Sequence, residues 1–220
     1  MEWPAAWVSL RLAFWTTVWL TLLGLPLAYW IATRKSRWIF LLESVIALPI
    51  VLPPTVIGFY LLMALGPRSP LGAAWLDATG TPLPFTFTGI LIGSIVFNLP
   101  FAVRPFIAGF QSVDRRLVEA SWSLGVSAPA TFLKITAPLA WPGILTGMAL
   151  AFAHTLGEFG VVLMLGGNIP GVTQTLSVLI YDDVQALDYA AAHRTSLVLL
   201  LFAFAILSVL FARPRKMVPV

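Results

Sequence analysis

The sequence has no cysteine and only two histidines, His154 and His193. Without a thiol, the chain cannot form a disulfide, a thiolate nucleophile or a cysteine-ligated metal site. Two imidazoles are too few for a histidine-based metal site unless other ligand types contribute. Charged residues are also scarce: they make up 10% of the 220 residues, against about 25% in a soluble domain. These shortages exclude thiol chemistry and argue against a soluble fold.

Several catalytic motifs are missing as well. The sequence contains no G-x-x-x-x-G-K-[ST] phosphate loop, so the chain cannot bind and hydrolyse ATP by that route. Neither H-E-x-x-H nor G-x-S-x-G is present, which removes the obvious membrane proteases and hydrolases. We therefore expect a chain that is not itself an enzyme and that holds no cofactor and no metal.

Apolar residues are abundant instead. They account for 59% of the sequence, and the mean hydropathy is +0.93, so the chain needs lipid as its solvent. A membrane span requires about 20 mostly apolar residues. We predict an all-α integral membrane protein in which residues 1–220 form one transmembrane domain with five transmembrane helices, at 7–33, 39–65, 87–110, 142–165 and 195–212.

The basic residues lie beside these hydrophobic segments, a pattern typical of membrane orientation and not of nucleic-acid binding. Basic residues concentrate on the cytoplasmic side of membrane proteins. Their distribution here predicts an N-out, C-in topology with the loop 111–141 in the cytoplasm. One side receives Arg34, Lys35, Arg37, Arg104, Arg115, Arg116, Lys134, Arg213, Arg215 and Lys216, whereas the other receives Arg68 and Arg194, with Arg11 inside the first span.

Prolines interrupt three of the predicted spans. A single proline removes one backbone hydrogen bond and is tolerated in lipid where neighbouring helices or a water-filled cavity satisfy the freed carbonyl. The segment LPIVLPP contains Pro49, Pro53 and Pro54. Three prolines so close together predict a broken helix that faces protein or a pathway.

The loop 111–141 has the pattern of two short helices. Asp114 is a suitable N-cap for a helix over 115–124, and Gly125 suits the left-handed position that ends it. Its apolar residues Leu117, Ala120 and Leu124 share one face, which must be buried in lipid headgroups or in a partner protein. Ser127 can cap a second helix with Pro129 in its first turn; we expect this helix to run to about Ile135 and Pro138 to stop it.

This loop resembles the EAA motif of bacterial ABC importer permeases, E-A-A-x3-G-x9-I-x-L-P. The residues at the motif positions are Glu119, Ala120, Ser121, Gly125, Ile135, Ala137 and Pro138. Two of them differ from the motif: Ser121 replaces its second alanine, and Ala137 replaces its leucine. The resemblance implies that the helix around Glu119, with Leu117 and Leu124, is a coupling helix seated in a groove of an ATPase subunit. It also implies that Glu119 pairs with a basic residue there and that Gly125 permits the turn.

Four further segments are similar to the molybdate branch of this family, with the sulfate/thiosulfate and tungstate permeases as close relatives. They are LPIVLPPTVIGFYLLMALG (48–66), SPLG (69–72), FNLPFAVRPF (97–106) and LGEFGVVLMLGGNIPG (156–171). The resemblance implies a MetI-like ABC importer permease fold in the prokaryotic inner membrane. It implies a homodimer as partner assembly, with two cytoplasmic ABC ATPase subunits that bind the ATP and an extracytoplasmic oxyanion-binding protein. Molybdate, tungstate and sulfate are all tetrahedral dianions, and no residue of the chain separates them.

Polar residues deep within the predicted spans are candidates for lining a pathway. At about 1.5 Å per residue, Asn98, beside Pro100, lies near the middle of the bilayer, as do His154 and Thr155, with Glu158 nearer the outer face. Asn98 serves either a passing oxyanion or an interhelical hydrogen bond. His154 and Glu158 are four residues apart, so they either neutralise each other or place Glu158 at an outer gate.

The segment 166–193 is too polar to span the membrane. It opens as a glycine-rich loop and continues with a short amphipathic stripe, Leu176, Leu179 and Ile180. It is either a solvated interfacial helix or part of a surface that receives the binding protein. A secondary anion transporter is the rival function, but it would need inverted repeats or paired charges within the membrane, and the sequence indicates neither.

Overall fold

The computed structural model describes residues 3–34 and 36–212, without the side chains of residues 210 and 211. Lys35, Arg213, Arg215 and Lys216, which contributed to the predicted orientation, lie outside the described residues. Within the described ranges every regular element is helical, so the predicted all-α class is confirmed.

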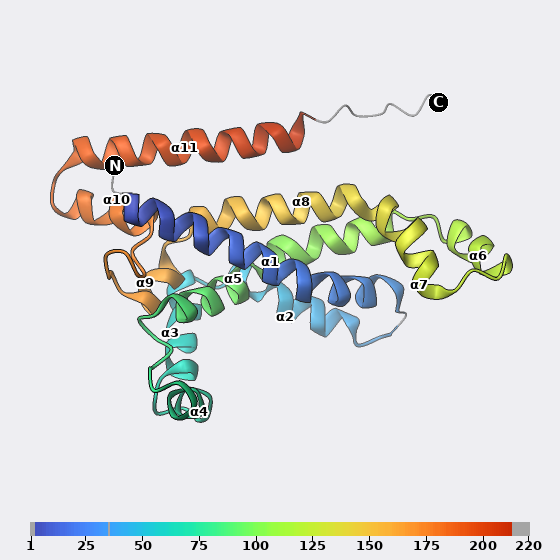
Figure 1. The fold of residues 1–220 in the computed structure, drawn as a ribbon, viewed down its shortest axis with the longest axis horizontal. Coiled ribbons are helices and arrows are strands. Elements are labelled where there is room, and N and C mark those ends of the chain that lie inside the picture. The colour runs from blue at the N-terminus through green and yellow to red at the C-terminus, as the bar shows by residue number, and fades with distance from the viewer. Residues whose placement is uncertain (1–2, 35, 213–220) are drawn as a thin grey trace.

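Three long helices form the centre of the molecule: α1 (Trp3–Thr33), α5 (Phe87–Gln111) and α8 (Ala137–Leu156). They run side by side, and α11 (Tyr189–Phe211) covers one flank (Figure 1). In the described part of the chain, four helical stretches are long and apolar enough to cross a membrane, or five if one bent pair counts as a single span.

The bent pair consists of α2 (Ile39–Val51) and α3 (Pro54–Leu65), which meet at an angle of 112°. Pro53 and Pro54 have no amide hydrogen, so they leave the carbonyls of Pro49 and Ile50 without helical partners. The predicted break in the segment 39–65 is therefore confirmed. Beyond it, α3 turns away from the bundle and is followed by α4 (Pro70–Thr79) (Figure 1).

The predicted end of the second loop helix is wrong. Pro138 does not stop it: α7 (Ala128–Thr131) continues through a π-helical turn (Phe132–Thr136) directly into α8. Proline is tolerated here because it lies in the first turn of α8, and the amide of Ala137 bonds to the carbonyl of Phe132, five residues back. The apolar stretch consequently begins well before residue 142.

The last two predicted spans also have different bounds. The helix expected over 142–165 ends at Leu156, and a short helix α9 (Gly160–Gly166) follows after a break. The final helix begins at Tyr189 instead of residue 195, because the Asp188 side chain accepts a hydrogen bond from the amide of Ala191 and caps it. The hydrophobic pattern located these helices. It did not predict their ends, because polar residues that continue a helix past the apolar stretch do not appear in that pattern.

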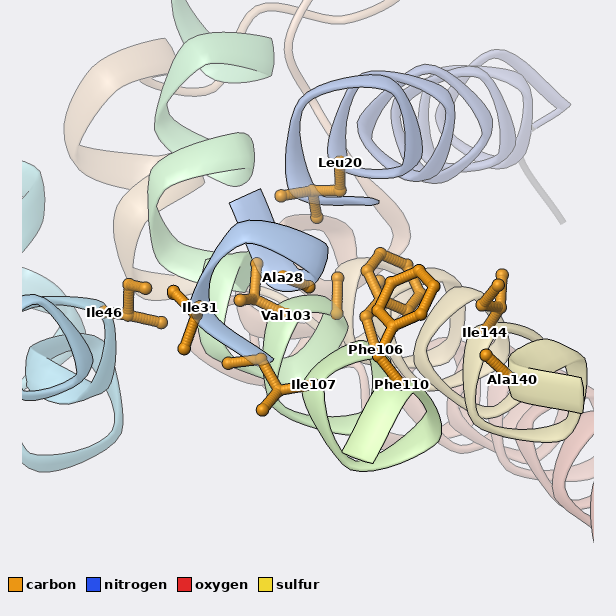
Figure 2. Close-up of a cluster of buried hydrophobic side chains, with 12 residues drawn as sticks. Leu20, Ala28, Ile31, Ile46, Val103, Phe106, Ile107, Phe110, Ala140 and Ile144 are labelled. Atoms are coloured by element: carbon orange, nitrogen blue, oxygen red, sulfur yellow. The ribbon is translucent and has the colours of Figure 1, made fainter. Parts of the chain in front are cut away.

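The half of the bundle nearer α6 is held together by one apolar cluster (Figure 2). Val103 and Phe106 of α5 are fully buried between α1 and α8. Glycines allow α5 and α8 to approach closely: a Cβ on Gly143 would lie 2.5 Å from the Cα of Gly109. Such close backbone contact between small residues is typical of helix association in lipid.

The end of the bundle where α1 begins is closed by α10 (Leu176–Gln185). Leu176 and Leu179 are buried against Ala5 and Ala6 of α1, and the amide of Leu176 donates to Ser9 Oγ at 2.8 Å. The predicted amphipathic stripe is therefore confirmed for these two leucines, and it anchors the segment 166–193 to the first helix.

Candidate functional site

A hydrogen-bonded cluster lies where α5 passes the break between α8 and α9. Asn98, in the middle of α5, is fully buried. Its Nδ2 donates to Glu158 Oε2 at 2.8 Å and to the Ser94 carbonyl at 2.9 Å. Its Oδ1 lies 2.8 Å from His154 Nδ1. One amide thus joins the end of α8, the break and α5.

Glu158 is the unusual member of this cluster. Its side chain is 4% exposed, and in the described residues no basic nitrogen lies within 4 Å of its carboxylate. Oε1 has no hydrogen-bond partner, and neither does the nearby Ser94 Oγ. A buried carboxyl group without a cation is costly, so such a group is retained where it serves a function or meets a further partner.

His154 and Glu158 do not pair with each other. The expectation that they stack on one helix face assumed a continuous helix, whereas α8 ends at Leu156 and the chain turns through Gly157. Each residue bonds to Asn98 instead. The His154 ring also stacks on Phe101, with centroids 3.8 Å apart, which holds the imidazole against α5.

A cavity of about 630 Å³ adjoins the cluster. Its walls come from Phe97 of α5, from His154 and Glu158, and from Pro54 and Thr55 at the start of α3. The first turn of α3 therefore points its positive end toward the cavity. A broken helix whose N-terminus faces a cavity within the membrane suits the passage of an anion.

The other two predicted pathway residues lie elsewhere. Thr155 is 2% exposed, and its hydroxyl donates to the carbonyl of Ala151 in its own helix. Pro100 is buried within α5. Neither is among the residues that line the cavity. Both were chosen for their expected depth along a span, but depth alone does not tell which face of the helix meets the cavity.

Three contributing residues were missed. Ser94 and Phe101 lie four residues before and three after Asn98, so helical spacing already placed them near its face. Thr55 lies in the proline-rich segment, and only the bend between α2 and α3 brings it to the cavity. No pattern in the sequence signals that bend angle.

The loop at the opposite end of the bundle has the predicted form at its start. Helix α6 (Arg115–Ser123) is capped by Asp114, whose carboxylate accepts from the amide of Arg116. Gly125 has φ of +77°, a conformation that favours glycine. Ser121 is buried and shares a hydrogen bond of 2.9 Å with Thr131, which holds α6 against α7.

The outward face of α6 combines a carboxylate with exposed apolar side chains. Leu117, Ala120 and Leu124 are exposed, Leu124 to 83%. Glu119 is also exposed and forms an ion pair of 2.8 Å with Arg115, one turn before it. An ion pair this open to solvent contributes little stability, so a cation from another protein can replace Arg115. This pair was not predicted, although the spacing of four residues indicates it.

The geometry can now be compared with known proteins. The family model for the inner membrane component of binding-protein-dependent transport systems matches residues 24–216. The chain belongs to this family. As a family member it is a multi-pass protein of the bacterial inner membrane and an ABC transporter permease.

Relatives and a solved structure agree with this assignment. The molybdenum transport system permease protein ModB of Azotobacter vinelandii is 44% identical over 208 residues, 94% of this chain and 92% of that protein. A probable sulfate transport system permease protein, cysT of Chlorella vulgaris, is 33% identical over 197 residues, covering 89% and 73%. The inward-facing MetNI methionine ABC transporter matches with a TM-score of 0.73 at 14% identity, covering 98% and 97%. The last comparison confirms the MetI-like fold.

Proposed function

We propose that this chain is the permease subunit of an ATP-driven molybdate importer, oriented N-out and C-in. The observation that carries the proposal is the 44% identity to a molybdenum transport permease over 94% of the chain. A match of this length includes the segments that form both the Asn98 cluster and the coupling loop.

In this proposal the working unit contains two copies of the chain, two ATPase subunits and an extracytoplasmic binding protein. The second copy is needed because the break at Pro53 and Pro54 is exposed, and irregular backbone within a membrane must be covered by protein or line a cavity. The apolar face of α6 has the exposure expected of a surface that docks an ATPase. The family description itself names a binding-protein-dependent system.

Coupling would begin at Glu119. A basic residue of the ATPase would take over from Arg115, and closure of the ATPase pair on ATP would draw the two α6 helices together. Because α6 connects directly to α5 and, through α7 and the π-helical turn, to α8, its movement is transmitted to the helices that carry Asn98 and His154. The bundle would then alternate between inward-facing and outward-facing packings.

The cavity would pass the oxyanion without holding it. The positive end of α3 attracts an anion, while the Glu158 carboxylate that lines the same cavity repels it. These opposing terms favour a brief stay, and affinity would reside in the binding protein. Tungstate and sulfate have the same shape and charge, and one relative is a sulfate permease by name, so they are the alternative cargoes.

The test is uptake of labelled molybdate by cells that carry the native transporter or its Glu119→Lys variant, with sulfate and tungstate as competitors. We expect saturable uptake that resists excess sulfate. We expect the variant to lose at least about 90% of the rate, because a lysine repels the cation that Glu119 should bind.

The matched control is Asp77→Lys, which makes the same charge change on the exposed surface of α4, at the other end of the molecule. It should retain most of the rate, and both variants must be inserted in the membrane at native levels. Native-like uptake by Glu119→Lys would contradict the coupling role and reopen the secondary-transporter alternative. Uptake abolished by sulfate would instead change only the cargo.

A further inference from the structure

A second cavity, of about 570 Å³, lies at the end of the bundle where α1 and α5 finish and α6 begins. One side is apolar and aromatic, with Tyr29, Phe110 and Trp122 among its walls. Tyr29 packs edge-on against Phe110 with centroids 5.4 Å apart, so this wall joins α1 to α5. The cavity is separate from the one beside Asn98, with which it shares no lining residue.

The rim of this cavity is basic. Arg34, directly after α1, and Arg115, in the first turn of α6, both line it. Both side chains are exposed, and within the ranges that the structure describes no carboxylate lies within 4 Å of Arg34. The Arg115 ion pair with Glu119 uses Nε, which leaves the N–H groups of both terminal nitrogens available for another anion.

The position of the cavity indicates what can enter it. The long helices α1 and α5 end here, so its mouth lies at the level where the bundle leaves the bilayer core. Tyr29 and Trp122 are residue types that favour this interface. Two guanidinium groups above an aromatic wall match a molecule with a phosphate at one end and an acyl chain at the other.

We propose that this cavity binds the headgroup of an anionic glycerophospholipid, such as phosphatidylglycerol, from the cytoplasmic leaflet. The phosphate contacts Arg34 and the free nitrogens of Arg115, and the start of the acyl chain lies along Tyr29 and Phe110. Because the same guanidinium also holds Glu119 through Nε, a phosphate on its terminal nitrogens shares the positive charge of Arg115 and weakens its hold on Glu119, the residue to which the proposed function gives the coupling role. The lipid thereby links membrane composition to the readiness of Glu119 for an ATPase.

The experiment is native mass spectrometry of the purified full chain after delipidation and exchange into mixed micelles with equal phosphatidylglycerol and phosphatidylcholine. We expect retention of phosphatidylglycerol in preference to phosphatidylcholine. Arg34→Gln should lower that retention about five-fold, the factor expected for one basic residue at an anionic headgroup. The matched control is Arg116→Gln, which removes the same charge from an exposed neighbour that does not line the cavity.

Two outcomes would overturn the proposal. An equal loss from Arg34→Gln and Arg116→Gln would mean general attraction to the basic face, without a site. Displacement of the lipid by millimolar inorganic phosphate would mean that the arginines bind free phosphate and that the aromatic wall contributes nothing. Neither outcome depends on the cargo, so molybdate uptake by the native transporter can succeed while this proposal fails.

Discussion

At the scale of single residues, the hydrogen bonding at the break between α8 and α9 depends on Asn98. Its amide donates to Glu158 and to the Ser94 carbonyl, and its oxygen meets His154. Asparagine can do this because one short side chain carries both donors and an acceptor. Replacing it leaves a buried carboxyl group and a half-buried imidazole without the partners that compensate their burial.

We expect Asn98→Ala to destabilise the chain by about 1–3 kcal/mol, because the buried Glu158 carboxyl group loses its hydrogen-bond donor. The measurement is chemical unfolding in mixed micelles. Thr155→Val is the control: it removes an equally buried hydroxyl that bonds only within its own helix, and it should cost less than about 1 kcal/mol.

Repeating Asn98→Ala in a chain that already carries Glu158→Gln tests whether the bond between Asn98 and Glu158 is the source of the effect. In Glu158→Gln, an amide replaces the carboxyl group, and a neutral group left unpaired costs less than a charged one. Asn98→Ala should therefore be less harmful in that background. If it costs the same in both, the bond between Asn98 and Glu158 is not the source of the effect.

At the scale of helices, the contact between α5 and α8 depends on two glycines that face each other. A Cβ on Gly143 would lie 2.7 Å from the Pro105 carbonyl oxygen and 2.5 Å from the Gly109 Cα. All of these neighbours are backbone atoms, so the helices would have to separate to admit a methyl group. Since α6 and α7 connect these two helices, the contact also sets the base from which the loop 111–141 projects.

We expect Gly143→Ala to destabilise the chain by about 1–3 kcal/mol through overpacking, and to lower the thermal unfolding temperature in detergent. Gly157→Ala is the matched control, because its nearest neighbour would be 3.8 Å away. It should change stability by less than about 0.5 kcal/mol. Equal stability of the two variants would show that α5 and α8 do not pack as tightly as described.

Helices were the level at which sequence reasoning succeeded best. The cap at Asp114, the left-handed Gly125 and the break at Pro53 and Pro54 follow from local chemistry, and the structure has all three. The prediction that Pro138 stops a helix was wrong because proline is common both after the end of a helix and in its first turn. A π-helical turn before it decides in favour of continuation, and such a turn has no reliable local pattern.

At the scale of the whole molecule, the cavity beside Asn98 requires a cover. Pro54 and Thr55 are exposed in the isolated chain, and they form part of a cavity that contains Glu158. A carboxyl group and a broken backbone cannot face lipid without a large cost. In the proposed transporter, a second copy that places its own cavity opposite this one would remove the cost and would join two half-pathways into one.

This arrangement predicts that Thr55→Cys cross-links two copies in membranes with a short thiol reagent, since the native sequence has no cysteine to interfere. Phe204→Cys, on the exposed side of α11, should react with a maleimide in detergent but remain uncross-linked in membranes. Cross-linking of Phe204→Cys and not of Thr55→Cys would place the second copy against α11 instead of the cavity, and would contradict this arrangement.

The sequence alone determined that the chain needs a lipid environment, roughly where its long helices lie, and which family it resembles. Each of these depends on composition or on residues near one another in the chain. Hydropathy is a sum over about 20 residues, and the loop 111–141 is formed by local caps and turns. Only the tertiary structure decided that Asn98 joins Glu158 to His154. It also decided that Thr155 does not line the cavity beside Asn98. Arg34 and Arg115 line a second cavity for the same reason. These relations depend on bend angles and helix rotations, which a few degrees of packing set and which no single segment encodes.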